Sequence, residues 1–334
     1  MTSTTLPKTM RAIVQSDPKS TILTLTTRPL PTPSPNTTEH LIKVHSVSPC
    51  SGELLWPANF PPPTLREFIP CYDISGTVVT SPNNASSPFK PGDEIYFRSN
   101  YLRNGCASDY TLGTTEEMAL RPKGLPAVEA TAIPLSAQTA WQALFIHSGV
   151  GDLDSASWKG KRVLVTAASG GVGMWVVQLA KIAGATVIGT CGPDNISLVK
   201  SLGADEVLNY RATEIQVWAE NANAKVDLVI DCIGRKSLTD AWWTVKEGGT
   251  VLSIFQPPNT ARPEDLSVSD VKDVFFIMEP RRDHLEPITK LVEEGRARGF
   301  VDSVWPLEQF AEAFKRVEGG HARGKVIIDL GLNQ

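Results

Sequence analysis

One segment points most clearly to a chemical function: Ala168-Ser-Gly-Gly-Val-Gly173, which consists mostly of very small residues. Its spacing matches a dinucleotide-binding turn with alanine in the first small position. Such residues let the backbone approach a pyrophosphate, and a following helix presents free N–H groups to the phosphates. An ordinary tight turn is the alternative. The predicted cofactor contacts are Ser169, Gly170, Gly171, Val172 and Gly173.

The flanking segments have the pattern that such a turn requires. An apolar strand is expected at 163–165 and an apolar helix at 172–183. Strand and helix patterns then alternate, which is typical of a doubly wound parallel sheet. Further strands are expected at 186–190, 226–231 and 250–255, and further helices at 195–202 and 237–245.

The pattern of predicted secondary structure changes near residue 125. Before that point, short apolar runs separated by turn-forming clusters predict a β-rich, barrel-like unit. These runs lie at 11–14, 22–26, 41–47 and 74–79. In the tail, apolar residues at helical spacing predict helices around 285–292 and 307–317, before a last strand at 325–330. A chain of 334 residues exceeds one typical core, so two domains are expected.

Composition and charge exclude several classes of function. Hydrophobic residues make up 41% of the chain and charged residues 20%, as in ordinary globular proteins. With a net charge of -4, neither nucleic acid nor a membrane is expected as a partner. The five histidines form no nucleophile motif, which argues against acyl transfer. The N-terminus has no apolar signal core, so a cytoplasmic location is expected.

Several motifs in a fixed order, spread over nearly the whole chain, resemble one family. They are Lys90-Pro-Gly-Asp-Glu-Ile, Ala132-Ile-Pro-Leu-Ser-Ala, Ser201-Leu-Gly-Ala-Asp-Glu-Val-Leu-Asn-Tyr, Asp231-Cys-Ile-Gly, Val274-Phe-Phe-Ile-Met-Glu-Pro and Gly324-Lys-Val-Ile. The chain resembles the zinc-independent, quinone oxidoreductase-like branch of the medium-chain dehydrogenase/reductase superfamily. This resemblance implies an α/β protein with a GroES-like β-barrel catalytic domain at 1–125 and a Rossmann doubly wound parallel-sheet NADPH-binding domain at 126–281. It implies that residues 282–334 return to the catalytic domain, and that the protein is a homodimer.

The residues also bear on zinc, which zinc-dependent relatives bind through a cysteine and a His-Glu pair. The five cysteines contain no C-x-x-C pair, and Tyr72-Asp73 stands where the His-Glu pair would be. We therefore expect no metal. A Cys50–Cys71–Asp73 site is the alternative.

The tip of the second strand of the expected sheet bears on the choice of cofactor. NAD-preferring sheets carry an acid there, whereas this chain reads Gly189-Thr-Cys-Gly-Pro, so NADPH is expected. Asp194 is expected to cap the helix that begins at Asn195, near which many relatives carry a lysine. With the resemblance, the remaining cofactor contacts are Thr190, Gly192, Tyr210, Arg211, Cys232, Ile233 and Phe276; Arg211 as a solvated surface charge is the alternative.

Catalytic residues are harder to assign. The resemblance places Ser48, Ser51, Phe60, Tyr72 and Thr139 near the nicotinamide, but relatives often have asparagine and aspartate where Ser48 and Ser51 stand. The residues thus do not identify the proton donor, for which Tyr72, Ser48 and Thr139 are the candidates. The predicted substrate pocket consists of Ser51, Trp56, Phe60 and Trp141, whose aromatic rings suit a flat conjugated substrate; ordinary core packing is the alternative.

We expect an NADPH-dependent, zinc-independent reductase of quinones or α,β-unsaturated carbonyls. Two alternatives remain at this point. One is an enoyl reductase that tailors a secondary metabolite, because fold does not fix substrate. The other is a non-catalytic NADPH-binding relative.

Overall fold

The computed structural model describes residues 6–61, 67–82, 87–220 and 224–332. The chain divides into two compact units. The first comprises Met1–Leu135, Pro280–Gly295 and Gly299–Gln334, and the second comprises Ser136–Glu279 and Arg296–Arg298. The change of unit after Leu135 falls later than the predicted boundary at 125. The predicted roles of the three segments stay a prediction.

The first unit is built on antiparallel strands. In its described part, β1 (Thr9–Val14) pairs with β2 (Thr24–Pro29), and a seven-stranded sheet has the order β14-β15-β3-β4-β5-β7, with β6 paired to β3. The other strands are β3 (Glu39–Ser48), β4 (Asp73–Thr80), β5 (Glu94–Arg98), β6 (Tyr110–Thr114) and β7 (Ala119–Leu120). The predicted β-rich unit is confirmed. The strand expected at 22–26 starts later, since Ile22 is exposed and the pairing with β1 begins at Thr24.

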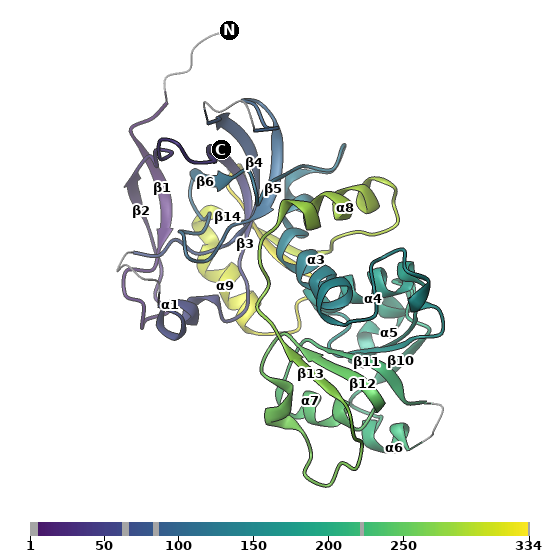
Figure 1. Cartoon of the computed structure of the whole chain (residues 1–334). Coiled ribbons are helices and arrows are strands. Elements are labelled where there is room, and N and C mark those ends of the chain that lie inside the picture. Colours follow the sequence, from purple (N-terminus) through teal and green to yellow (C-terminus); the bar gives the residue numbers. More distant parts are fainter. Residues whose placement is uncertain (1–5, 62–66, 83–86, 221–223, 333–334) are drawn as a thin grey trace. The chain divides into compact units, whose positions relative to one another are not determined.

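The C-terminal segment belongs to the first unit. β15 (Lys325–Asp329) lies antiparallel to β3 and parallel to β14 (Val301–Pro306). Figure 1 shows the yellow helix α9 (Phe310–Glu318) beside the purple and blue strands of this unit. The predicted tail helices are confirmed by α8 (Arg282–Glu293) and α9, which bury Leu285, Ile288 and Phe314.

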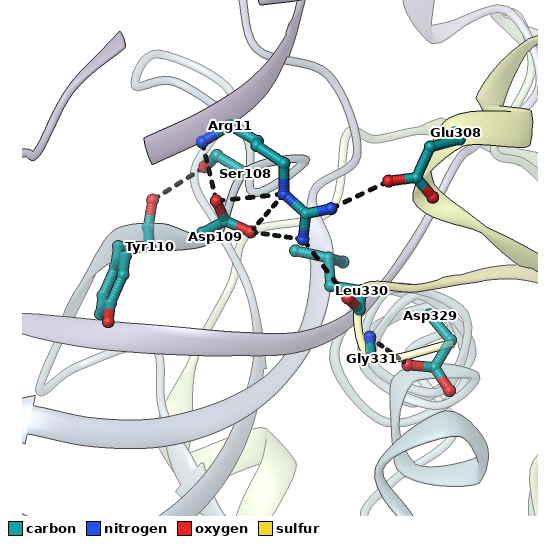
Figure 2. A network of polar contacts seen from close by, with 8 residues as sticks. All are labelled: Arg11, Ser108, Asp109, Tyr110, Glu308, Asp329, Leu330 and Gly331. Atoms are coloured by element: carbon teal, nitrogen blue, oxygen red, sulfur yellow. Dashed lines mark hydrogen bonds and ion pairs between the residues drawn. The ribbon is translucent and has the colours of Figure 1, made fainter. Parts of the chain in front are cut away.

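An ion-pair network ties this tail to the start of the chain (Figure 2). The Arg11 guanidinium lies 2.9 Å from an Asp109 carboxylate oxygen and 2.9 Å from Glu308. It also donates to the Leu330 carbonyl oxygen at 3.5 Å. Burial opposes ionisation of Arg11, but hydrogen bonding to Asp109 outweighs it and raises the pKa of Arg11. One side chain thus links both ends of the chain within the first unit.

The second unit contains a six-stranded parallel sheet in its described part, with the order β10-β9-β8-β11-β12-β13. Its strands are β8 (Arg162–Val165), β9 (Thr186–Cys191), β10 (Glu206–Asn209), β11 (Val226–Asp231), β12 (Val245–Ser253) and β13 (Lys272–Phe275). Numbered along the chain, this is the order 3-2-1-4-5-6 of a dinucleotide-binding sheet. The predicted doubly wound sheet is confirmed.

Helices join these strands. They are α4 (Gly171–Ala183), α5 (Ile196–Ser201), α6 (Ile215–Ala219) and α7 (Arg235–Trp242), while α1 (Trp56–Asn59), α2 (Ala127–Thr131) and α3 (Pro134–Trp141) come earlier. The helix expected at 237–245 ends sooner. The Val226 N–H donates to the Thr244 carbonyl oxygen, and Val245 begins β12 beside Val226. The apolar side chain of Val245 fits the helical pattern, but it packs in the core of the sheet.

Candidate functional site

The fingerprint turn lies between β8 and α4, as its sequence predicts. Ala167 adopts a left-handed φ of 48°, and its carbonyl oxygen accepts from the Gly170 N–H at 2.8 Å. The Ala168 N–H donates to the Thr190 carbonyl oxygen at 2.9 Å, which joins the turn to β9. Gly170 is the N-cap of α4, and no side chain of this residue accepts from the N–H groups of the first turn. These N–H groups are therefore suited to binding an anion.

Glycine is required at the third fingerprint position by close packing. A Cβ on Gly173 would lie 2.2 Å from the Ala167 carbonyl oxygen and 2.8 Å from the Ala168 Cα. A Cβ on Gly170 would meet only the Ala167 oxygen, at 3.2 Å. The two glycines therefore have different roles: Gly173 permits helix–turn contact, and Gly170 leaves space beside the helix N-terminus.

The residues predicted for the adenosine phosphate gather at the ends of β9 and β10. The Tyr210 N–H donates to the Cys191 carbonyl oxygen, and a Cβ on Gly192 would lie 3.7 Å from the Tyr210 hydroxyl. The Arg211 guanidinium lies 5.8 Å from the Tyr210 ring centroid. Tyr210 is 51% exposed, whereas Thr190 is buried. This corner thus combines a phenol, a cation and a small residue.

Asn195 is a residue of this corner that the sequence did not reveal as a contact. Its amide Nδ2 donates to Ser169 Oγ at 3.1 Å, and its buried Oδ1 has no protein partner in the described part of the chain. Asn195 is also the N-cap of α5, so the expectation that Asp194 caps this helix is wrong. The contact with Ser169 spans 26 positions, and no local pattern could show it.

A buried carboxylate orders the carboxyl ends of three neighbouring strands. Asp231 accepts from Thr166 Oγ1 at 2.7 Å, from Ser253 Oγ at 2.8 Å and from the Gly234 N–H at 2.8 Å. The Cys232 N–H in turn donates to Thr166 Oγ1 at 2.9 Å. The predicted contacts Cys232 and Ile233 therefore lie in a fixed segment at the carboxyl edge between β8 and β11, where the strand order reverses and such sheets bind ligands.

The other predicted residues of the second unit have separate surroundings. The Phe276 ring lies 4.3 Å from that of His147. Trp141 contacts Phe145 edge-on at 4.8 Å, and Thr139 is buried. Ring packing of this kind is what a core position would also show.

In the first unit, two predicted aromatic residues lie together. The rings of Trp56 and Tyr72 are 5.5 Å apart, and the Arg98 guanidinium lies 5.6 Å from the Tyr72 ring centroid. Ser51 and Phe60 are exposed in the segment that carries Trp56. Ser48 is buried, and its hydroxyl donates to the Val326 carbonyl oxygen at 2.7 Å. That bond occupies the proton of Ser48 and disfavours it as a donor to substrate.

The residues weighed for a metal site are engaged otherwise. Asp73 lies 3.0 Å from the Lys325 ammonium and accepts from the Leu135 N–H at 2.7 Å. Burial raises the pKa of the Cys50 thiol to about 11 and that of the Cys71 thiol well above its usual value. Among the described residues, no three His, Cys, Asp or Glu side chains are placed to hold a metal ion. The described residues thus do not fit a catalytic zinc.

A surface cavity of about 460 Å³ in the first unit is lined in part by residues of β1, β2 and β6. Its lining includes Met10, Arg28, Ile69, Leu102 and Tyr110. None of the predicted site residues lines it. The cavity is therefore separate from the catalytic candidates.

Comparison with known proteins identifies the family. Residues 202–328 match the family model described as zinc-binding dehydrogenase. The chain is 51% identical over 328 residues to a "Probable zinc-binding oxidoreductase, mitochondrial" of Arthroderma benhamiae, covering 97% of this chain and 98% of that protein. It is 34% identical to the "Chloroplast envelope quinone oxidoreductase homolog" of Arabidopsis thaliana, covering 90% of this chain and 92% of the relative.

A solved structure agrees with the fold. The quinone oxidoreductase of Coxiella burnetii superposes with a TM-score of 0.79 at 24% identity, covering 97% of this chain and all of that one. This likeness confirms the predicted fold class, with a GroES-like and a Rossmann domain.

The cytoplasmic location expected from the N-terminus is wrong. The names of the two relatives place them in mitochondria and in the chloroplast envelope. Organelle transit peptides are amphipathic and need no apolar core, so the expectation rested on the wrong kind of signal. In the part of the chain that the structure describes, no helix has the length and apolar character needed to cross a bilayer.

The chain is also 31% identical over 291 residues to the "NAD(P)H oxidoreductase RTN4IP1, mitochondrial" of Danio rerio, covering 78% of this chain and 72% of that protein. With three relatives above 30% identity that align along most of its length, the chain belongs to the medium-chain dehydrogenase/reductase superfamily, in its quinone oxidoreductase-like branch, and is an oxidoreductase with a nicotinamide cofactor.

Proposed function

We propose that this protein is an NADPH-dependent reductase of quinones or α,β-unsaturated carbonyls that works without zinc. The observation that carries the choice of cofactor is the corner formed by the ends of β9 and β10. It offers Tyr210, Arg211 and the Asn195 amide but has no acid at the tip of β9 to repel a 2′-phosphate. The amide of Asn195 can turn about its terminal torsion, since Ser169 Oγ can donate or accept.

Each part of the second unit has a proposed role in holding this cofactor. The first turn of α4 would bind the pyrophosphate through its N–H groups. The adenosine phosphate would be held by Thr190, Gly192, Tyr210 and Arg211. The nicotinamide would be contacted by Cys232, Ile233 and Phe276. The Asp231 network keeps the Cys232–Ile233 segment fixed, so that binding does not have to order it.

The proposed chemistry is transfer of a hydride from the nicotinamide to an electron-poor carbon of the substrate. Negative charge develops on the substrate oxygen, which then takes a proton from water or from a nearby hydroxyl. Tyr72 is the proposed hydroxyl, because its ring contacts that of Trp56 in the predicted substrate pocket. Ser48 donates to the main chain. The proposed aromatic surface for a flat conjugated ring consists of Trp56 and Tyr72, whose rings are in contact, and of Phe60 on the same segment as Trp56.

The loss of NADPH absorbance with a panel of quinones and enones tests this function. We expect turnover with NADPH that a chelator leaves unchanged. Cofactor binding without turnover of any panel member would favour a non-catalytic relative, and activity confined to an acyl-type enone would favour a biosynthetic enoyl reductase. Zinc lost together with activity would contradict the zinc-independent mechanism.

Two properties of the whole protein complete the proposal. By the family resemblance we infer a homodimer, which light scattering of the purified protein can check. From the names of the relatives we infer that the protein functions in an organelle, which fractionation of the source cells can check.

A further inference from the structure

Glu53 is a buried carboxylate of the first unit that has no role in the proposed chemistry so far. It lies in the short helical turn η1 (Glu53–Leu55) and is only 3% exposed. Its Oε2 accepts from the Cys50 N–H at 3.1 Å, and its Oε1 accepts from the Cys71 N–H at 2.9 Å. One side chain therefore joins two main-chain segments that are 18 residues apart.

These two segments carry the aromatic surface. Ser51 and Trp56 lie on the first segment, while Tyr72 directly follows Cys71 on the second. The rings of Trp56 and Tyr72 are in contact, with centroids 5.5 Å apart. The link through Glu53 therefore joins the two segments that carry these rings.

The conformation of Cys71 makes the second bond more important. Its φ is 63°, in the left-handed region that a cysteine seldom adopts without support. The bond from its N–H to the buried carboxylate helps to hold this conformation and so fixes the direction in which Tyr72 leaves the turn.

We propose that Glu53 is a positioning residue for the substrate: its carboxylate holds the Trp56 segment against the Tyr72 segment and so sets the geometry of the aromatic surface. This inference rests on the proposed function, because it takes Trp56 and Tyr72 to contact the substrate. Glu53 itself donates nothing to the reaction and touches no reacting atom.

The charge state of Glu53 gives the proposal a distinctive readout. Burial raises the pKa of Glu53 to about 7, although the Cys71 and Cys50 amides lower it. The charged groups facing it are Lys325, which favours the carboxylate, and Asp73, which disfavours it. The neighbouring Cys50 and Cys71 thiols have raised pKa values and stay neutral. A protonated carboxyl accepts two N–H bonds poorly, so the link weakens as the pH falls below 7.

Kinetics of full-length variants test this role. Glu53→Gln keeps the shape but loses one acceptor and the charge, so the KM for a quinone should rise about tenfold, while NADPH binding in fluorescence titrations stays unchanged. A pH transition near 7 in kcat/KM should be present in the wild type and absent in Glu53→Gln. Glu312→Gln, on the exposed face of α9, is the matched control and should behave as the wild type.

A second variant separates the effect of the charge from the effect of side-chain length. Glu53→Asp keeps the charge but is one methylene shorter, so it should raise the KM and still show a pH transition. Equal KM values and pH profiles for the wild type and Glu53→Gln would overturn the proposal.

Hydrogen exchange distinguishes failure of this proposal from failure of the proposed function. The Cys50 and Cys71 amides should exchange slowly in the wild type and faster in Glu53→Gln, whether or not any quinone is reduced. Wild-type protein without turnover but with this exchange pattern would overturn the assigned activity and leave the link intact. Unchanged exchange in Glu53→Gln would overturn the link itself.

Discussion

At the scale of single residues, the fingerprint glycines differ in what they tolerate. A Cβ on Gly173 would collide with the backbone at 2.2 Å, whereas one on Gly170 meets a single oxygen at 3.2 Å. We predict that Gly173→Ala lowers the free energy of unfolding of the second unit by about 1–3 kcal/mol and weakens NADPH binding.

Gly170→Ala is the matched control for the stability part of this prediction, because its Cβ would meet only one oxygen. Chemical denaturation and fluorescence titration of both variants make the comparison. Equal NADPH affinity in folded Gly173→Ala and in the wild type would contradict the placement of the pyrophosphate.

A second prediction at the scale of residues concerns the tip of β9, which we propose selects the cofactor. Thr190→Asp would place a carboxylate where the 2′-phosphate is proposed to lie, so kcat/KM for NADPH should fall about 100-fold or more through like-charge repulsion. NADH lacks this phosphate and should be affected much less. The ratio of kcat/KM for the two cofactors is the measurement.

Arg211→Ala provides an independent check of the same corner. It should weaken NADPH selectively, by about 1–2 kcal/mol, if its guanidinium pairs with the phosphate. No change would make Arg211 a surface cation that only stacks on Tyr210. A wild type that prefers NADH, or equal slowing with both cofactors in Thr190→Asp, would show that the phosphate lies elsewhere.

At the scale of elements, one carboxylate holds the carboxyl ends of β8, β11 and β12 in register. Asp231 accepts three hydrogen bonds from groups on these strands and on the following turn. Asp231→Asn removes the charge and one of the two acceptor oxygens, so we predict a loss of about 2 kcal/mol in the free energy of unfolding of the second unit and weaker cofactor binding.

Asp240→Asn is a suitable control for Asp231→Asn. Asp240 pairs with Lys236 one turn away on the surface of α7, so its loss should cost about 0.5 kcal/mol or less. Urea denaturation with NADPH titration would measure both variants. Similar losses for the two variants would contradict a special role for the buried network.

At the scale of the whole molecule, stability should depend on pH in two opposing ways. Burial alone would raise the pKa of Asp302, but hydrogen bonds from Arg316 and from the Arg323 amide outweigh it and lower this pKa. The pKa of Asp227 is lowered in the same way, because its bonds to Lys246 and to the Arg162 amide outweigh the effect of burial. These carboxylates stabilise the fold above their unfolded pKa near 4, and this contribution is lost as the pH falls through their lower folded values.

Glu53 affects the pH dependence of stability in the opposite direction. Its pKa is raised from 4.5 to about 7, so its contribution to stability is full below pH 4.5 and is lost as the pH rises through 7. We predict that the free energy of unfolding of the wild type falls by on the order of 2 kcal/mol through this group between pH 4.5 and 8. Glu53→Gln should abolish this decrease. Urea denaturation of both proteins at the two pH values is the measurement, and parallel pH dependences would exclude the effect.

The sequence by itself determined the features that depend on neighbouring residues. The strand–turn–helix at Ala168–Gly173 follows from side-chain size and local hydrophobic pattern, and the alternation of elements predicts the parallel sheet. The ordered motifs identify the family, which the comparisons confirm. Local patterns were less reliable at element ends: Val245 is apolar whether it continues a helix or starts a strand, and only its pairing beside Val226 settles which.

Only the tertiary structure decided which polar groups meet. The link from Glu53 to Cys71, the bond between Asn195 and Ser169, and the contact of Asp231 with Thr166 span 18, 26 and 65 positions. Periodicity reports which face of an element is buried, but it carries no information about the partner across that face. Ser48 shows the consequence, because its hydroxyl is a plausible donor in the sequence and is already bonded to a carbonyl oxygen 278 positions away in the fold. A buried polar group needs a partner, and folding alone brings that partner to it.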